Sequence, residues 1–237
     1  MRLDKLVSES LPCSRLEAKK IILSGQILVD GKVCKKAANK ISDDNDVYFS
    51  GRREGSQSLT KLTRQKPCYI LLNKPSGYIC SAQDEGYPSA LNLLTIRNKA
   101  KLHFAGRLDQ DSTGLVLISD DGQWTHRVTS PKFKHVKTYQ ISLATPLSKD
   151  AVELLEKGML LKDSTALTKP TTVNILQSGI VELKIIEGRY HQVKRMIAAV
   201  GSHVVSLHRA SVGHVTIGDD MKLGSWRYLT TSEINQF

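Results

Sequence analysis

The chain has 237 residues, enough for one large domain or for a small domain joined to a medium-sized one. Its 40% hydrophobic and 24% charged residues are ordinary for a globular protein and exclude disordered, collagen-like and coiled-coil chains. Lys and Arg outnumber Asp and Glu by 34 to 23, and the resulting formal charge of +11 indicates a polyanionic partner.

The apolar runs are short. Residues 69–72, 115–118 and 196–200 fall well below the roughly 18 residues that a membrane-spanning helix needs. The N-terminus is charged from its second residue, which argues against a secretory signal and predicts a cytoplasmic protein without a membrane partner. The cysteines are spaced too widely for a CxxC motif, so we expect reduced, structural thiols at Cys13, Cys34, Cys68 and Cys80.

The first fifty residues have the pattern of one small domain. Ser14 followed by Glu17 forms a capping box, which predicts a helix over residues 15–24. Alternating apolar residues around an Asp-Gly pair at 30–31 predict a β-hairpin, and the strand pattern resumes at 47–49.

Residues 51–66 separate this domain from the rest of the chain. They carry Gly, Ser, Thr, Gln and basic residues with little periodicity, so we expect a basic, flexible linker. The predicted domains are therefore 1–50 and 67–237. Residues 1–66 carry 14 Lys or Arg and 8 Asp or Glu, whereas the remaining 171 residues carry 20 and 15, so the front of the chain is more basic per residue.

Strand-like stretches dominate from Pro67 onward. Two helices are predicted, at 148–158 with Ser148 as N-cap and at 191–200. Because no regular βαβ alternation appears, the pattern favours an α+β domain with a mostly antiparallel sheet. The predicted strands are 68–73, 114–119, 138–143, 171–176, 180–186 and 203–207.

Several reaction classes lack their usual motifs. The approach to a phosphate loop between Gly25 and Gly31 has five intervening residues where four are needed. No GxGxxG follows a strand, and neither HExxH nor GxSxG occurs. Nucleotide hydrolysis, dehydrogenase, zinc-protease and serine-hydrolase activities therefore have no support.

A dense polar cluster spans residues 105–115 and is followed by an apolar strand. Glycines bracket Arg, Ser, Thr and two carboxylates, so the chain makes a tight loop that delivers polar groups to the end of a strand. Asp109 and Asp111 are compatible with an acid/base pair, a metal site or simple turn chemistry. The neighbouring Asp-Asp-Gly at 120–122 is more economically a turn than further metal ligands.

A second polar cluster spans residues 187–196, between a predicted strand and a predicted helix. Cationic groups at such a junction can hold an anion with help from the helix N-terminus. The alternative is an ordinary basic helix surface. His191, taken alone, is more often a structural histidine than a catalyst.

Together the two clusters resemble a known set of motifs. GRLDQDSTGLVLISDDG is similar to the catalytic motif of pseudouridine synthases, and LNKPSGYICS, KTYQ and EGRYHQVKRMIAAVG resemble the flanking motifs in the same order. The stretch from RLDKLVSES to KKAANKI resembles an S4 domain, a small RNA-binding module. An S4 domain before this set is typical of the RsuA-like branch, which acts on small-subunit ribosomal RNA. The resemblance covers roughly residues 1–50 and 67–237.

The resemblance implies roles for particular residues of the larger domain. The essential aspartate falls on Asp109 and not on Asp111. Tyr139 would stack on the extruded uracil. The basic partner of the aspartate falls on Lys194, where many related synthases have Arg, and the adjacent Arg195 is a second candidate.

Further residues are implied in substrate and RNA binding. Arg107, Arg195, His191 and Gln192 would hold the flipped nucleotide or its phosphates. In the S4 domain, where Leu16 is expected to face the core, the RNA-facing residues would be Arg2, Lys5, Arg15 and Lys19.

The chemistry makes these residue types reasonable. Uridine becomes pseudouridine when the N1–C1′ bond breaks and the base is rejoined through C5, with no redox change and no group donor, so we expect neither cofactor nor metal. A carboxylate kept ionised by a nearby cation, and an aromatic face for a base taken out of its stack, are what the reaction needs.

The sequence thus predicts a monomeric isomerase that acts on 16S rRNA or on a small-subunit assembly intermediate, by resemblance at uridine 516. A large-subunit rRNA synthase shares the same motifs. A non-catalytic S4-type assembly factor would explain the charge, and a metal-dependent nuclease built on Asp109 and Asp111 is a more distant alternative.

Overall fold

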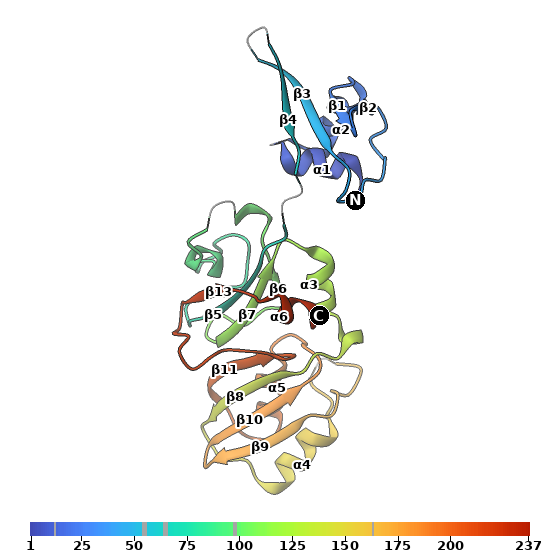
Figure 1. Cartoon of the computed structure of the whole chain (residues 1–237). Helices are drawn as coiled ribbons and strands as arrows, with labels where there is room; N and C mark the ends of the chain where they lie inside the picture. Colours follow the sequence, from blue (N-terminus) through green and yellow to red (C-terminus); the bar gives the residue numbers. More distant parts are fainter. Residues whose placement is uncertain (12, 54–55, 64–65, 97–98, 163) are drawn as a thin grey trace. The chain divides into compact units, whose positions relative to one another are not determined.

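The computed structural model describes residues 1–11, 13–53, 56–63, 66–96, 99–162 and 164–237. The chain forms two compact units, Met1–Lys66 and Pro67–Phe237, which Figure 1 shows with their secondary structure. Each unit has its own apolar core. No helix among these residues is long and apolar enough to cross a membrane.

The first unit packs two helices against a four-stranded sheet of order β2-β1-β3-β4. The predicted capping box is confirmed, because Ser14 accepts from the Glu17 N–H and the Glu17 carboxylate accepts from the Ser14 N–H. The hairpin is confirmed as well, with Val29 opposite Lys32. The elements are α1 (Leu3–Ser10), α2 (Arg15–Leu23), β1 (Ile27–Val29), β2 (Lys32–Val33), β3 (Val47–Arg53) and β4 (Ser56–Lys61).

Two expectations for this unit were wrong. Part of the predicted linker 51–66 is regular structure, because β3 continues to Arg53 and pairs with β4 in an antiparallel hairpin. The polar residues of β4 hid this strand, since even its one large apolar side chain, Leu59, is exposed. Leu16 is 65% exposed, and Ala18 and Ile22 are the buried residues of α2.

The second unit is built on a nine-stranded sheet whose main path is β13-β5-β7-β11-β8-β10-β9, with β6 on β7 and β12 on β11. Among the strands of the described residues, β7 and β11 form the one parallel pair, which confirms an α+β domain with a mostly antiparallel sheet. The strands are β5 (Tyr69–Lys74), β6 (His103–Ala105), β7 (Thr113–Ser119), β8 (Lys137–Leu143), β9 (Thr172–Gln177), β10 (Ile180–Ile185), β11 (Val204–Val212), β12 (Val215–Thr216) and β13 (Trp226–Tyr228).

Both faces of the central strands are buried. Ile70 and Leu72 of β5 join one core cluster, whereas Leu71 between them packs in another that contains Trp124 of α3 (Gly122–Thr129). This explains why these strands read as continuous apolar runs and not as alternating ones. The helices are α3 (Gly122–Thr129), α4 (Lys149–Lys157), α5 (Gln192–Ala199) and α6 (Thr231–Asn235), with single 3-10 turns at Ala90–Leu93, Lys99–Lys101 and Pro131–Phe133.

The Asp-Asp-Gly stretch at 120–122 is more than the expected turn. Asp121 is the N-cap of α3, and its carboxylate accepts from the N–H groups of Gln123 and Trp124. The helix was missed because its eight residues include few strong helix formers.

Gly114 gives a stability test of the sheet. Its φ is +106°, and a Cβ at this position would lie 2.6 Å from the backbone nitrogen of Arg209 and still closer to its carbonyl oxygen. We expect Gly114→Ala to lower the free energy of unfolding by about 2 kcal/mol or more, measured by urea denaturation. The matched control is Gly122→Ala at the start of α3, where a Cβ meets nothing within 4 Å. Equal stabilities of the two variants would contradict this packing.

Candidate active site

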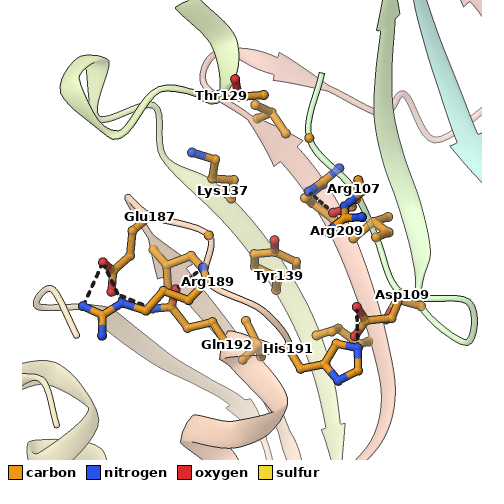
Figure 2. A pocket seen from close by; sticks show the side chains of 18 of the residues that line it. Arg107, Asp109, Thr129, Lys137, Tyr139, Glu187, Arg189, His191, Gln192 and Arg209 are labelled. Atoms are coloured by element: carbon orange, nitrogen blue, oxygen red, sulfur yellow. Dashed lines mark hydrogen bonds and ion pairs between the residues drawn. The ribbon is translucent and has the colours of Figure 1, made fainter. Parts of the chain in front are cut away.

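The two polar clusters of the sequence meet at a pocket of about 200 Å³ in the second unit. Its walls are the loop before β7, the first residues of β8, residues 207–212 of β11 and the segment that leads into α5 (Figure 2). Six of the residues implied by the resemblance line it together: Arg107, Asp109, Tyr139, His191, Gln192 and Lys194.

Lys74, the last residue of β5, holds the loop that carries Asp109. The Lys74 side chain is completely buried, and its ammonium donates to the carbonyls of Gln110 (3.2 Å), Tyr78 (2.8 Å) and Pro75 (3.0 Å). Burial lowers the pKa of Lys74. Because an ammonium has three N–H donors, all of them are satisfied without a carboxylate partner.

Arg209 of β11 holds the same loop from the other side. Its Nε donates to the carbonyl of Leu115 at 2.7 Å, and its Nη1 donates to that of Arg107 at 3.3 Å. The residue is only 4% exposed. The backbone on either side of Asp109 is therefore fixed to two different strands by buried cations.

Asp109 faces the N-terminus of α5. Its carboxylate lies 3.1 Å from Lys194 Nζ and 3.3 Å from His191 Nε2; Figure 2 shows the His191 contact. His191 is the N-cap of α5 and has a left-handed backbone, φ 46°. The exposed ring of Tyr190 stacks on its imidazole, with the centroids 3.8 Å apart. Asp109 thus contacts two cation-forming side chains one helical turn apart.

Lys194, and not Arg195, is the neighbour of Asp109. Consecutive helical residues point about 100° apart, so only one of the two can face the loop. Arg195 turns away and donates to the carbonyls of Tyr190 and Lys162. Of the residues expected to bind substrate, Arg195 is the one that does not line the pocket.

Gln192 lines the pocket but is occupied by protein contacts. It is 3% exposed, its amide donates to Glu187 Oε1 at 2.8 Å, and its carbonyl accepts from the Arg189 N–H at 2.9 Å. Glu187 also pairs with Arg189 at 3.3 Å. This network folds the segment before α5 back on itself and positions the helix N-terminus.

Tyr139 forms the wall of the pocket on β8 and is 8% exposed. Lys137, two residues earlier, points to the same side of the strand and also lines the pocket. Figure 2 shows Tyr139 with Asp109 and His191 on one side and Lys137 on the other. Burial, and to a smaller extent the nearby charge of Arg209, lower the pKa of Lys137 to about 8.

Comparison with known proteins identifies this arrangement. Residues 68–199 match the RNA pseudouridylate synthase family model, and residues 1–47 match the S4 domain. The chain is 45% identical to "Ribosomal small subunit pseudouridine synthase A" of Yersinia pestis, over 99% of this chain and 97% of that protein. The protein of that name from Escherichia coli K12 is 44% identical over 99% and 98%.

A solved structure agrees. A crystal structure of a pseudouridylate synthase superimposes with a TM-score of 0.70 at 41% sequence identity, and covers 100% of this chain and 99% of that one. The chain belongs to the RNA pseudouridylate synthase family. It is an RNA pseudouridine synthase with an N-terminal S4 domain.

The four residues of the S4 domain that are expected to bind RNA differ in the ion pairs they make within the protein. Arg2 and Arg15 contact the buried carboxylate of Asp4 at 2.8 and 3.4 Å. Lys5 lies 3.6 Å from Glu9. Lys19 is exposed and makes no ion pair with a described residue. The two arginines therefore contribute to the fold of the S4 domain whether or not RNA is bound.

Sequence reasoning missed three of the residues that shape the synthase pocket. Lys74 lies in the LNKP motif at the end of an apolar strand, and the sequence does not indicate that this lysine is completely buried. Arg209 and Lys137 lie in strands, and nothing in their spacing connects them with Asp109. No group of three or more His, Cys, Asp or Glu side chains in the described ranges is placed to hold a metal ion.

The environment of Lys137 can be tested by titration. After reductive methylation with a ¹³C label, we expect an NMR resonance of the synthase to titrate near pH 8, because burial and the Arg209 charge both disfavour the ammonium form. The resonance is assigned by its loss in Lys137→Arg. A midpoint near the ordinary lysine value of 10.5 would contradict the buried, cation-flanked position.

Proposed function

We propose that this synthase converts one uridine of 16S rRNA, by resemblance uridine 516, to pseudouridine, and that Asp109 is its catalytic carboxylate. The observation that carries the proposal is the contact between Asp109 and Lys194 at the mouth of a pocket walled by the buried ring of Tyr139. The choice of small-subunit rRNA rests on the names of the relatives that match almost the whole chain.

The pocket supports a mechanism on a nucleotide flipped out of its stack, because a pocket of about 200 Å³ takes one base and not a duplex. Tyr139 offers its ring face to the uracil. Lys194 Nζ and His191 Nε2 lie against the Asp109 carboxylate, at 3.1 and 3.3 Å, and hold it at the pocket. Arg107, whose side chain is exposed at the rim, is placed for the phosphate of the flipped nucleotide.

The atoms balance without a second substrate. The N1–C1′ bond breaks, the C5–C1′ bond forms, and the proton that leaves C5 is replaced by one gained at N1. The reaction needs no electron acceptor or group donor. We propose that the synthase carries it out as a cytoplasmic monomer on 16S rRNA or on a small-subunit assembly intermediate.

Asp109→Asn tests the catalytic proposal. We expect the variant to bind 16S rRNA as the parent does and to form no pseudouridine, because the amide keeps the shape and loses the charge. The measurement is pseudouridine mapping of 16S and 23S rRNA after incubation, with Asp219→Asn, an exposed carboxylate outside the pocket, as the control.

Three outcomes would overturn parts of this proposal. Full activity of Asp109→Asn removes the role of the carboxylate. Modification of 23S rRNA alone indicates a large-subunit enzyme. Binding by the parent with no modification of either RNA indicates an assembly factor.

Lys19 tests the RNA-binding role of the S4 domain without disturbing its fold, because it makes no ion pair with a described residue. We expect Lys19→Ala to weaken rRNA binding and to reduce the slope of log affinity against log salt by about one, since one phosphate contact is lost. Lys149→Ala, an exposed lysine on α4 away from the pocket, is the charge-matched control. Equal salt slopes for the two variants would contradict the assignment.

A further inference from the structure

Lys194 lies between two carboxylates of the same loop. Its Nζ is 2.6 Å from Asp111 Oδ1 and 3.1 Å from Asp109 Oδ2. The shorter contact is therefore made to the carboxylate that the family resemblance leaves without a role. The Asp111 side chain is 62% exposed, compared with 25% for Asp109.

Asp111 is outside the pocket that receives the nucleotide. It is absent from the pocket lining, whereas Asp109, Ser112 and Lys194 all belong to it. The Ser112 N–H donates to the Asp109 carbonyl at 3.2 Å, which turns the chain so that both carboxylates face α5. Asp111 therefore reaches the pocket through residues that line it: mainly Lys194, at 2.6 Å, and by a longer contact of 3.5 Å the Ser112 hydroxyl, which donates to Asp111 Oδ1.

We infer that Asp111 is a positioning residue of the synthase: it holds the Lys194 ammonium beside Asp109 and keeps it charged while Asp109 reacts. This inference rests on the proposed function, in which Asp109 and Lys194 act together. Asp111 itself touches neither the substrate nor the reacting atoms.

The first argument is geometric. A lysine stem has four rotatable carbons, and one contact of 3.1 Å to Asp109 leaves it free to swing into solvent. Asp109 also contacts His191 and, in the proposed function, engages the nucleotide during the reaction. When it does so, Lys194 would lose its counter-charge if Asp111 were not there. A second carboxylate that takes no part in the chemistry keeps the ammonium in place throughout.

The second argument concerns the charge of Lys194. Burial acts to lower its pKa, but the hydrogen bonds and charges of Asp111 and Asp109 outweigh burial and raise it. The titratable side chains that also face this pair are His191, which contacts Asp109, and the buried Lys74, which donates to the carbonyl of Gln110 in the same loop. Removal of the Asp111 charge leaves burial opposed by Asp109 alone, so Lys194 loses its proton at lower pH than in the parent.

Asp111→Asn tests the inference because the amide keeps the size and loses the charge. Single-turnover pseudouridine formation is measured on 16S rRNA between about pH 6 and pH 9.5, with saturating enzyme and at varied enzyme concentration. We expect the maximal rate to fall about tenfold, the half-saturating concentration to stay unchanged, and the alkaline limb of the profile to move to lower pH. Asp111→Glu, which restores the charge, should restore the parental alkaline limb.

The controls separate this inference from the proposed function. Asp219→Asn should follow the parental profile, and equal melting temperatures for all variants exclude a folding defect. An unchanged rate and pH profile of Asp111→Asn, or a change in half-saturation alone, would overturn the positioning role while Asp109→Asn stays inactive. Activity of Asp109→Asn would instead overturn the proposed function itself.

Discussion

The site depends on a row of three residues that crosses the centre of the large sheet. Lys74 of β5 lies opposite Gly114 of β7, and Gly114 lies opposite Arg209 of β11. Both cations are buried. Lys74 Nζ and Arg209 Nη1 donate to carbonyls of the loop before Gly114, and Arg209 Nε donates to the carbonyl of Leu115 after it. A buried charge is costly unless it is hydrogen-bonded, so these cations and the loop that supplies their acceptors must form together. The absence of a side chain at Gly114 is what lets the backbone of Arg209 approach.

A second anchor brings the cationic partner to that loop. Glu187, Arg189 and Gln192 bind one another in front of α5, and the left-handed turn at His191 starts the helix with Lys194 facing Asp109. The Asp109–Lys194 pair is thus formed by two segments with separate supports: the loop is bonded to residues of β5 and β11, and the segment before α5 is bonded within itself. Sites supported in this way hold their geometry better than sites on free loops, which suits a reaction in which a base must be released, turned and recaptured within one pocket.

Local signals predicted local structure well, and failed where burial or tertiary contacts decide. The Ser14–Glu17 capping box and the hairpin at 30–31 depend on a few adjacent residues, and both are confirmed. β4 was taken for linker because its polar residues carry no alternation that would mark a strand. The meeting of Asp109 with Lys194 came from resemblance, since no spacing rule connects residues 85 positions apart. The structural roles of Lys74 and Arg209 could not be assigned from sequence, because the sequence does not show whether a lysine or arginine is buried against carbonyls or exposed to solvent.

The positive charges of the chain have different roles in the structure, which the net charge does not show. The formal charge of +11 suggests a surface that grips phosphates. However, Arg2 and Arg15 neutralise the buried Asp4, and Lys74 and Arg209 hold the active-site loop from inside the protein. All four count toward the net charge, but Arg2 and Arg15, although exposed, are paired with Asp4, and Lys74 and Arg209 are buried. We therefore expect the salt dependence of RNA binding to report on the exposed cations and activity to depend on the buried ones, so that the two properties respond to different substitutions in the same chain.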